Sequence, residues 1–227
     1  MSFYRFAQGV VRVVARMLYR LRLEGLENVP TDHGFLLCPN HISAFDPILV
    51  GGWIQPECTF MAKEELFRFK PFGALIRALG AFPVARGKGD TSAVDHAVEL
   101  IRSGRVVTIF PEGHRSRTGA LQKLKSGAVV IAARTQSDIL PCAIKKGKRR
   151  FLRRTVTVRY GKLIPYADLD IVEQTPGEIK AANRLLTAEL SRLLERSEDA
   201  VLLDTSALDF DASLEALLAI VKERVPL

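Results

Sequence analysis

A histidine and an aspartate stand five residues apart in the segment NHISAFD, which runs from Asn40 to Asp46 between an apolar stretch and a proline. Histidine is the usual general base in proteins, and a carboxylate on its second ring nitrogen holds the ring in one tautomer. If His41 precedes a helix and Asp46 lies in its first turn, the two side chains can meet. We therefore predict a His41–Asp46 pair that takes a proton from an attacking hydroxyl.

Two other interpretations of this segment remain open. In the first, Ser43 is the nucleophile of a Ser–His–Asp triad. Because Ser43 is only two residues from His41, it is better placed to support the local turn, and we expect direct attack without a covalent intermediate. In the second, His41 is only a hydrogen-bonded residue beside a core strand.

Residues suited to chemistry also follow two later apolar stretches. Arg86 ends the run AFPVAR, and the segment PEGHRSR, residues 111–117, follows the β-branched run VVTIF. In α/β proteins, the loops after the carboxyl ends of parallel strands form the functional site. We therefore expect these two segments to lie beside the His41 segment.

Apolar strand-like runs alternate with helical patterns along most of the chain, which predicts an α/β fold with a mostly parallel central sheet flanked by helices. The run at 155–164 is expected near an edge of this sheet. The predicted strands are 34–40, 58–63, 81–86, 105–113, 139–145 and 155–164, and the predicted helices are 46–54, 65–80, 90–104, 126–136, 176–197 and 213–225.

Four segments occur in an order that resembles one known family. NHISAFD, GAFPVAR, FPEGHRS and ILPCAI resemble the motifs of the PlsC-type glycerophospholipid acyltransferases, the 1-acylglycerol-3-phosphate O-acyltransferases. The stretch MAKEELFRFKPFGALIRALG is similar to the family's segment between its first two motifs. The resemblance covers roughly residues 24–165. One departure is His114, where the family usually has threonine, and this leaves the substrate preference open.

The resemblance implies the glycerolipid-acyltransferase fold in a single domain, and a reaction that needs no cofactor. A fatty acyl group would pass from acyl-carrier protein or acyl-CoA to the free hydroxyl of lysophosphatidic acid, giving phosphatidic acid. His41 and Asp46 would be catalytic. The residues that match the family's substrate-binding positions are Lys63, Arg86, Glu112, Gly113 and Arg115.

The roles of these substrate-binding residues follow from the acceptor's phosphate. Arginine binds phosphate through its planar fork of donors, and lysine acts as a point charge. Glu112, on a tight loop, would fix the loop or bind substrate hydroxyls. The alternatives are that the acceptor is another lysophospholipid or a lyso-aminolipid, or that the protein binds lipid without catalysis.

Composition narrows the class of protein. The 227 residues are 48% hydrophobic, which suffices for one sizeable core. Residues 1–164 carry a net charge of +15 and residues 165–227 a net charge of −7, which together give +8. Aromatic content is 7% and no nucleic-acid-binding module is recognisable, so nucleic acid is not an expected partner.

The three scattered cysteines predict buried free thiols, and the four histidines show no metal-ligand spacing.

The first 23 residues predict an amphipathic helix that lies in a membrane interface. Its arginines fall on one stripe, its large apolar residues lie opposite, and no acidic residue precedes Glu24. The stripe is Arg5, Arg12, Arg16 and Arg20, opposite Phe3, Val10, Val14, Met17 and Leu21. The alternative is a helix that packs on its own domain with solvated arginines.

We expect three segments: this membrane-associating helix at 1–23, an acyltransferase domain at 24–197, and an acidic connector with a last helix at 198–227. No apolar run is long enough to span a bilayer, and we see no secretory signal. The expected location is therefore the cytoplasmic face of an anionic membrane, as a peripheral protein.

A second basic cluster lies at 145–154, where the sequence KKGKRRFLRR holds seven cations in ten residues. Three interpretations are open for it. The cations could be solvated, they could contact anionic lipid headgroups, or they could dock an acidic acyl-carrier protein.

Overall fold

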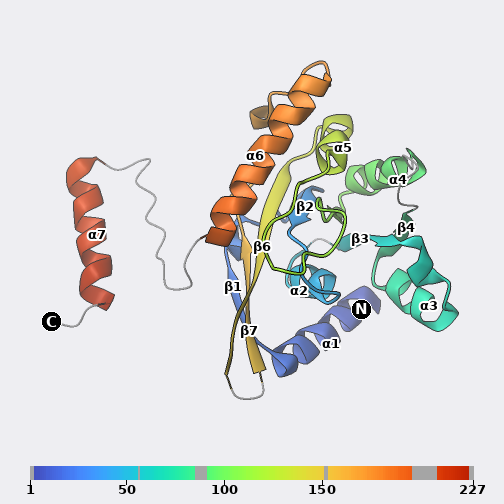
Figure 1. Cartoon of the computed structure of the whole chain (residues 1–227), viewed down its shortest axis with the longest axis horizontal. Helices are drawn as coiled ribbons and strands as arrows, with labels where there is room; N and C mark the ends of the chain where they lie inside the picture. Colours follow the sequence, from blue (N-terminus) through green and yellow to red (C-terminus); the bar gives the residue numbers. More distant parts are fainter. Residues whose placement is uncertain (1–2, 56, 85–90, 151–152, 196–208, 225–227) are drawn as a thin grey trace. The chain divides into compact units, whose positions relative to one another are not determined.

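The computed structural model describes residues 3–55, 57–84, 91–150, 153–195 and 209–224. Its helices and strands alternate along the chain, as the sequence predicts (Figure 1). The strands are β1 (Tyr19–Glu24), β2 (Leu36–Pro39), β3 (Cys58–Lys63), β4 (Ala81–Val84), β5 (Val106–Thr108), β6 (Ile139–Arg150) and β7 (Arg153–Tyr160). The α-helices are α1 (Phe3–Leu18), α2 (Asp46–Gly51), α3 (Lys70–Ala78), α4 (Thr91–Arg102), α5 (Gly127–Thr135), α6 (Pro176–Glu195) and α7 (Phe210–Arg224), and the short 3-10 helices are η1 (Leu26–Asn28), η2 (Glu64–Phe67) and η3 (Tyr166–Leu169).

The strands form one sheet in the order β1-β7-β6-β2-β5-β3-β4. Every neighbouring pair is parallel except β6 and β7, which form an antiparallel hairpin. The fold is therefore the expected single α/β domain with a mostly parallel sheet. Parallel strands need crossover connections, and the helices between them supply these.

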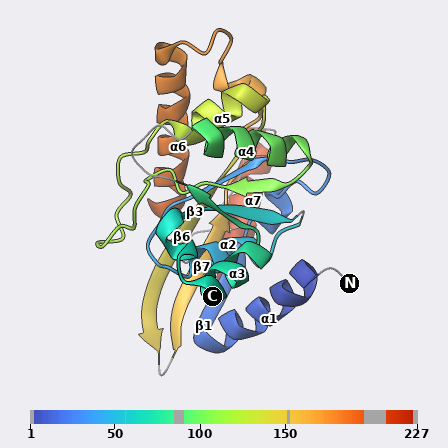
Figure 2. The ribbon, with the colours of Figure 1, turned by 90° about the vertical axis from the view of Figure 1, so that its right-hand side faces the viewer.

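Helices cover both faces of the sheet and give it two hydrophobic cores (Figures 1 and 2). On one face, residues of α4, α5 and α6 pack together, including Ala97, Ile131 and Leu186. On the other face, α1 and α2 contribute residues such as Ala15 and Leu49. Consecutive residues of β2 alternate between the two cores, as the two-residue period of a strand requires.

The first 23 residues differ from the prediction of one continuous helix. Helix α1 ends at Leu18, and residues 19–24 form the edge strand β1, parallel to β7. The sequence YRLRLE alternates apolar and basic residues, and its even positions Arg20 and Arg22 are the exposed ones. A period of two favours a strand over a helix. The strand β7 is therefore second from the edge of the sheet, which agrees with the expectation that it lies near an edge.

Two further boundaries differ from the predictions. The predicted helix over 65–80 is divided into η2 and α3, because Pro71 suits the first turn of a new helix. The predicted strand over 105–113 ends at Thr108, so that residues 109–113 are free to form a loop.

The described chain forms two compact units, Met1–Leu194 and Glu195–Leu227. Helix α1 and the rest of the α/β domain lie in the first unit. In the second unit the structure describes the helix α7, which matches the predicted last helix, while most of the predicted acidic connector lies outside the described residues. Among the helices described, none has the length and apolar character needed to cross a bilayer.

Candidate active site

The predicted site segments follow strands that are neighbours in the sheet. Parallel strands β2, β5, β3 and β4 lie side by side in this order. His41 follows β2, Glu112 lies just beyond β5, and Lys63 ends β3. Their carboxyl ends therefore share one edge of the sheet, as expected for an α/β site. Arg86, which follows β4, lies outside the described residues.

His41 and Asp46 meet at the start of α2, as their spacing suggests. His41 Nδ1 lies 2.8 Å from Asp46 Oδ2, and Asp46 is fully buried as the first residue of the helix. The same carboxylate oxygen accepts hydrogen bonds of 2.6 Å from the backbone N–H groups of Ile42 and Ser43. The carboxylate is therefore fixed in place by the loop that carries the histidine.

The His41 ring presents its second nitrogen on the side away from Asp46. Its Nδ1 donates to Asp46, so the lone pair of the neutral ring lies on Nε2. Within the described residues, Nε2 makes no hydrogen bond. The ring stacks on Phe110 with centroids 4.1 Å apart, and 14% of the side chain is exposed. A ring held in this way can accept a proton from a hydroxyl that approaches Nε2.

Ser43 supports the turn and makes no hydrogen bond with the His41 ring among the described residues. Its hydroxyl accepts a hydrogen bond of 3.3 Å from the backbone N–H of Phe45. Its own N–H donates to Asp46. Both contacts suit the local turn, and neither activates the hydroxyl as a nucleophile.

Glu112 ties the two motif loops together. It is 1% exposed, and its two oxygens accept hydrogen bonds from the backbone N–H groups of His41 (2.7 Å) and Gln122 (2.9 Å). The N–H of Ser116 in turn donates to the carbonyl oxygen of His41 over 2.7 Å. Of the two roles considered from the sequence, this geometry favours fixing the loop over binding substrate hydroxyls.

Asn40 has a positioning role that sequence reasoning missed. Its side chain is buried and exchanges two hydrogen bonds with the backbone of Ile144 on β6, one from Nδ2 (3.2 Å) and one to Oδ1 (2.6 Å). The amide thus continues the β2–β6 pairing past the end of β2. The signal available in the sequence was a polar residue directly before the catalytic candidate, which by itself does not reveal its partner.

The remaining predicted residues differ in their surroundings. Gly113 has a φ of +75°, where a Cβ atom would meet the Lys125 side chain at 2.9 Å, so the turn suits glycine. Arg115 is exposed two residues later, and has no ion-pair partner in the described part of the chain. Lys63 is half exposed and pairs with Glu65 over 2.8 Å. His114 is exposed on the same loop.

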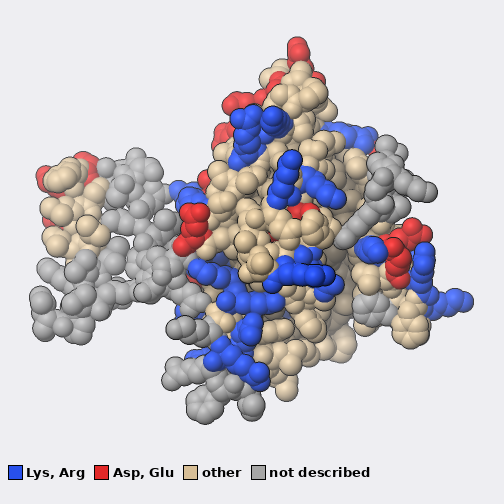
Figure 3. All heavy atoms as spheres, viewed as in Figure 1, with Lys and Arg blue, Asp and Glu red and all other residues tan. Residues whose placement is uncertain are grey.

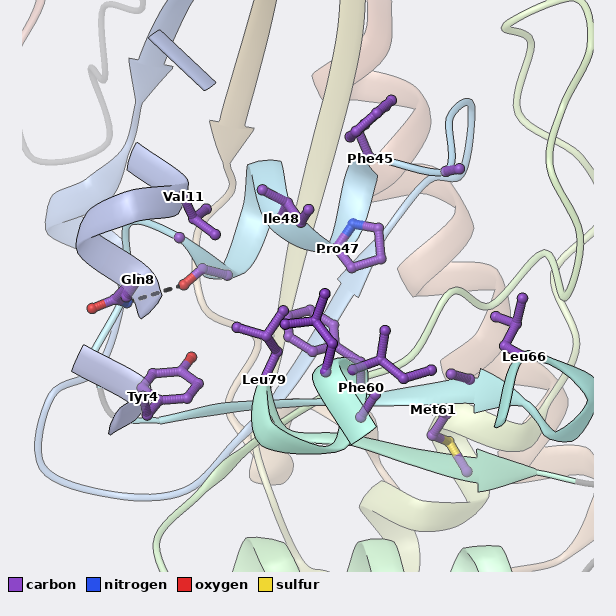
Figure 4. Close-up of a pocket in the computed structure, with 17 residues that line it drawn as sticks. Tyr4, Gln8, Val11, Phe45, Pro47, Ile48, Phe60, Met61, Leu66 and Leu79 are labelled. Atoms are coloured by element: carbon purple, nitrogen blue, oxygen red, sulfur yellow. Dashed lines mark hydrogen bonds between the residues drawn. The ribbon is translucent and has the colours of Figure 1, made fainter. Parts of the chain in front are cut away.

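An apolar pocket of about 400 Å³ opens beside the His41 segment (Figure 4). Helix α1 lines one side, α2 another, and η2, α3, β3 and β4 the rest. Phe45 and Pro47, the neighbours of Asp46, contribute to its wall. The lining residues named in Figure 4 are Tyr4, Gln8, Val11, Phe45, Pro47, Ile48, Phe60, Met61, Leu66 and Leu79. The pocket is thus nearly all hydrocarbon, with few polar groups.

The polar side chains of this wall are held by the backbone behind it. Tyr4 Oη accepts a hydrogen bond of 2.9 Å from the N–H of Cys58, and burial raises the pKa of Tyr4. Gln8 donates to the carbonyl oxygens of Gly51 and Ile54 over 3.2 and 3.0 Å. These contacts fix α1 against the end of α2 and the start of β3.

The three cysteines are free and buried, as predicted. Burial raises the pKa of Cys38 and Cys58 to about 12, and that of Cys142 well above its ordinary value. Buried thiols of this kind are not nucleophiles at neutral pH. Within the described residues, no cluster of histidine, cysteine and carboxylate side chains could hold a metal ion.

The chain is similar to known acyltransferases. A family model described as acyltransferase matches residues 20–145. The chain is 31% identical over 169 residues to the 1-acyl-sn-glycerol-3-phosphate acyltransferase of Bacillus subtilis, covering 73% of this chain and 84% of the relative. It is 28% identical over 203 residues to the enzyme of the same name from Streptococcus pneumoniae, covering 86% and 75%.

A solved structure shares the fold. The crystal structure of the 1-acyl-sn-glycerophosphate (LPA) acyltransferase PlsC from Thermotoga maritima matches with a TM-score of 0.67 and 24% identity, over 86% of this chain and 81% of that one. The family model matches the segment that carries the motif loops, and the relative from Bacillus subtilis matches 73% of this chain. This chain is therefore an acyltransferase and belongs to the PlsC-type glycerophospholipid acyltransferase family.

Proposed function

We propose that this enzyme transfers a fatty acyl group from an acyl thioester, on acyl-carrier protein or coenzyme A, to the free hydroxyl of 1-acylglycerol-3-phosphate, giving phosphatidic acid. The observation that carries the proposal is the His41–Asp46 hydrogen bond of 2.8 Å at the edge of an apolar pocket. The names of the relatives from Bacillus subtilis and Streptococcus pneumoniae support the choice of acceptor.

The proposed chemistry is a direct attack assisted by a general base. His41 Nε2 takes the hydroxyl proton of the acceptor as its oxygen attacks the thioester carbonyl carbon. Asp46 stabilises the imidazolium that forms. When the tetrahedral intermediate collapses, the carbon–sulfur bond breaks and the leaving thiolate takes the proton from Nε2. The products are an ester and a free thiol, so no metal or organic cofactor is needed.

The acceptor's phosphate would bind the cations that border this edge of the sheet. Arg115 is the first candidate, because its guanidinium is exposed and the next residue, Ser116, hydrogen-bonds to His41. Lys63 and Arg86 would complete the set, with Lys63 exchanging its partner Glu65 for the phosphate. A guanidinium can bind two phosphate oxygens at once, which fixes the hydroxyl relative to His41.

The apolar pocket would hold a fatty acyl chain. Its walls are hydrocarbon, and it begins at Phe45 and Pro47, which flank Asp46. Burial of each methylene group stabilises a bound chain by about 0.8 kcal/mol. A chain seated there would have its carboxyl end close to His41, where acyl transfer takes place.

Helix α1 would place the enzyme on the cytoplasmic face of a membrane. The residues exposed on one side of it are apolar and form what we call the α1 apolar face: Phe3, Phe6, Val10, Val13, Val14 and Met17. Arg12 and Arg16 lie on the other side, over the Trp53 ring at 5.7 and 4.6 Å. The apolar face is thus available to a bilayer, while these two arginines pack on Trp53, which follows α2.

A matrix of donors and acceptors tests the proposal directly. Purified protein would be assayed with acyl-carrier-protein and CoA thioesters against lysophosphatidic acid, other lysophospholipids and a lyso-aminolipid. We expect phosphatidic acid as the main product and no product with His41→Ala. Preferred turnover of another lysolipid would replace the acceptor in the proposal. Lipid binding without any turnover would overturn it.

A further inference from the structure

The end of β6 and the start of β7 carry an unusual concentration of positive charge. Residues 145–154 include seven cations, and no acidic residue occurs from 139 to 167. The structure describes the side chains of five of these cations, and we call them the basic hairpin: Lys145, Lys146, Arg149, Arg153 and Arg154. In the register of the two strands, Arg149 stands directly opposite Arg154. Like charges in this position destabilise an antiparallel pair. An anion bound at the surface of the hairpin would relieve this repulsion.

The basic hairpin lies next to the end of α1. Arg153 Nη1 donates a hydrogen bond of 3.1 Å to the carbonyl oxygen of Arg16, in the last turn of the helix. Tyr19, which begins β1, is paired with Arg154. Both ribbon views place the hairpin and α1 at the same end of the first unit (Figures 1 and 2). The space-filling view shows lysine and arginine side chains gathered there (Figure 3).

We propose that the basic hairpin binds anionic phospholipid headgroups beside the α1 apolar face. A bilayer surface offers both kinds of contact, hydrocarbon for the helix and phosphate for the hairpin. An acidic protein would match the charge but would leave the apolar face uncovered. This inference rests on the proposed function in one respect: a lipid acceptor lies in a membrane, so the enzyme must bind there to reach it.

The position of the hairpin links this surface to the site. Lys146 Nζ, near its base, donates a hydrogen bond of 3.1 Å to the carbonyl oxygen of Ile42, between His41 and Ser43. Headgroups held by the hairpin would therefore lie near the loop that carries His41. Two attachments, α1 and the hairpin, fix an orientation on the membrane that a single helix leaves free to rotate.

The test compares two double variants with the same change in charge. The first is Arg149→Glu with Arg154→Glu. The matched control is Lys180→Glu with Arg184→Glu, two exposed cations in the first half of α6, which lies away from the hairpin in Figures 1 and 2. Each substitution removes two units of charge, so both variants go from +8 to +4.

Binding would be measured by flotation with phosphatidylcholine vesicles, with and without phosphatidylglycerol. We expect the hairpin variant to lose at least about tenfold in partitioning onto the anionic vesicles and little on the neutral ones. The control should stay close to wild type. High salt should reduce wild-type binding toward that of the hairpin variant, because salt screens the headgroup contacts. Acylation of a water-soluble short-chain acceptor, measured in parallel, reports on the proposed function separately.

Three results would overturn the inference. One is flotation of the hairpin variant equal to wild type. A second is an equal loss of vesicle binding in the control variant, which would mean that the net charge of the protein determines binding and that the hairpin surface does not. The third is unchanged flotation with a reduced rate for acyl-carrier-protein donors alone, which would reassign the hairpin to the acidic carrier.

The single substitution Arg154→Glu separates a lipid role from a structural one. It places a carboxylate opposite Arg149, so the hairpin should gain stability, with a rise in the thermal midpoint of up to about 4 °C. Vesicle binding should fall in the same protein. A hairpin whose cations serve only the fold would show no loss of binding as stability rises.

Discussion

The side chain of Asn40 and the backbone of Ile144 exchange two hydrogen bonds, of 3.2 and 2.6 Å, in the buried interior between β2 and β6. Because His41 is the next residue, this pair fixes the start of the His41 loop relative to the sheet. Asp46 and Glu112 then fix the loop from its other sides. The position of His41 is therefore set by contacts to buried groups and not by the loop alone.

We predict that Asn40→Ala lowers stability and activity together. The substitution leaves the N–H and C=O of Ile144 without their partner, at a cost of about 1–3 kcal/mol for each buried group. Thermal unfolding would measure the loss. The control is Asn183→Ala, since Asn183 is half-buried and, among the described residues, its side chain makes a single hydrogen bond, of 3.3 Å to the carbonyl oxygen of Leu124. A loss no greater than that of the control would contradict the positioning role.

The His41–Asp46 pair should account for most of the rate. We expect His41→Ala to reduce kcat by about 10²–10⁴, the usual contribution of a general base, with the fold retained. Asp46→Asn should also lose most of the rate, since the tautomer is no longer enforced. His33→Ala is the matched control, because that histidine also contacts carboxylates, Asp32 and Asp138, yet is exposed.

Ser43→Ala distinguishes direct attack from an acyl-enzyme. Among the described residues, the hydroxyl makes its hydrogen bond with the turn at Phe45 alone, so the substitution should cost little activity. An inactive Ser43→Ala protein with normal folding, or acyl label trapped on Ser43, would instead favour the triad.

Arg115 should act on the acceptor and not on the donor. Removal of a charge-assisted hydrogen bond costs about 1.5–3 kcal/mol, so Arg115→Ala should raise KM for the acceptor by about 10- to 100-fold. Arg115→Lys should recover only part of this, because the planar fork is lost. Arg117→Ala, two residues along the same loop, is the control. A rise in the donor's KM with an unchanged acceptor KM would reassign the loop.

A larger side chain in the apolar pocket should shift the preferred acyl length. Leu79 lies in the pocket wall on the side of Tyr4 and away from Phe45 (Figure 4). Leu79→Trp should therefore favour shorter chains, as measured by competition between thioesters of different length. Leu185→Trp, at a partly exposed leucine on α6, is the control. An unchanged length profile would mean that the acyl chain binds elsewhere.

The sequence predicted the fold class, and the meeting of the His41 and Glu112 loops at one edge of the sheet, because local patterns determine both. Strand and helix periods are local, and the loops after neighbouring parallel strands must share one edge. The partners of Asn40 and Glu112 could not be predicted in this way. Ile144 is 104 residues from Asn40 and His41 is 71 residues from Glu112, and only the order of the strands brings each pair together.

The N-terminal segment shows the limit of a helical projection. A stripe of arginines at Arg5, Arg12, Arg16 and Arg20 fits one helix, yet the chain changes to a strand after Leu18. Arg12 and Arg16 then contact Trp53, and Arg12 Nε donates to Gly52 over 2.6 Å. The pattern predicted the two faces of α1 correctly, but the contact with Gly52 and Trp53 determines which face is turned outward.

The α1 apolar face should carry the salt-resistant part of membrane binding. Phe6 and Met17 are 63% and 69% exposed on it, and burial of such side chains contributes about 1.5–3 kcal/mol each. We expect Phe6→Glu with Met17→Glu to abolish vesicle binding at high salt and to reduce turnover of a bilayer-bound acceptor, while a water-soluble short-chain acceptor is still acylated. Val172→Glu with Leu185→Glu, at exposed apolar residues outside α1, is the matched control. If the α1 variant floats with vesicles at high salt as wild type does, helix α1 does not enter the membrane, and the basic hairpin must account for binding at low salt.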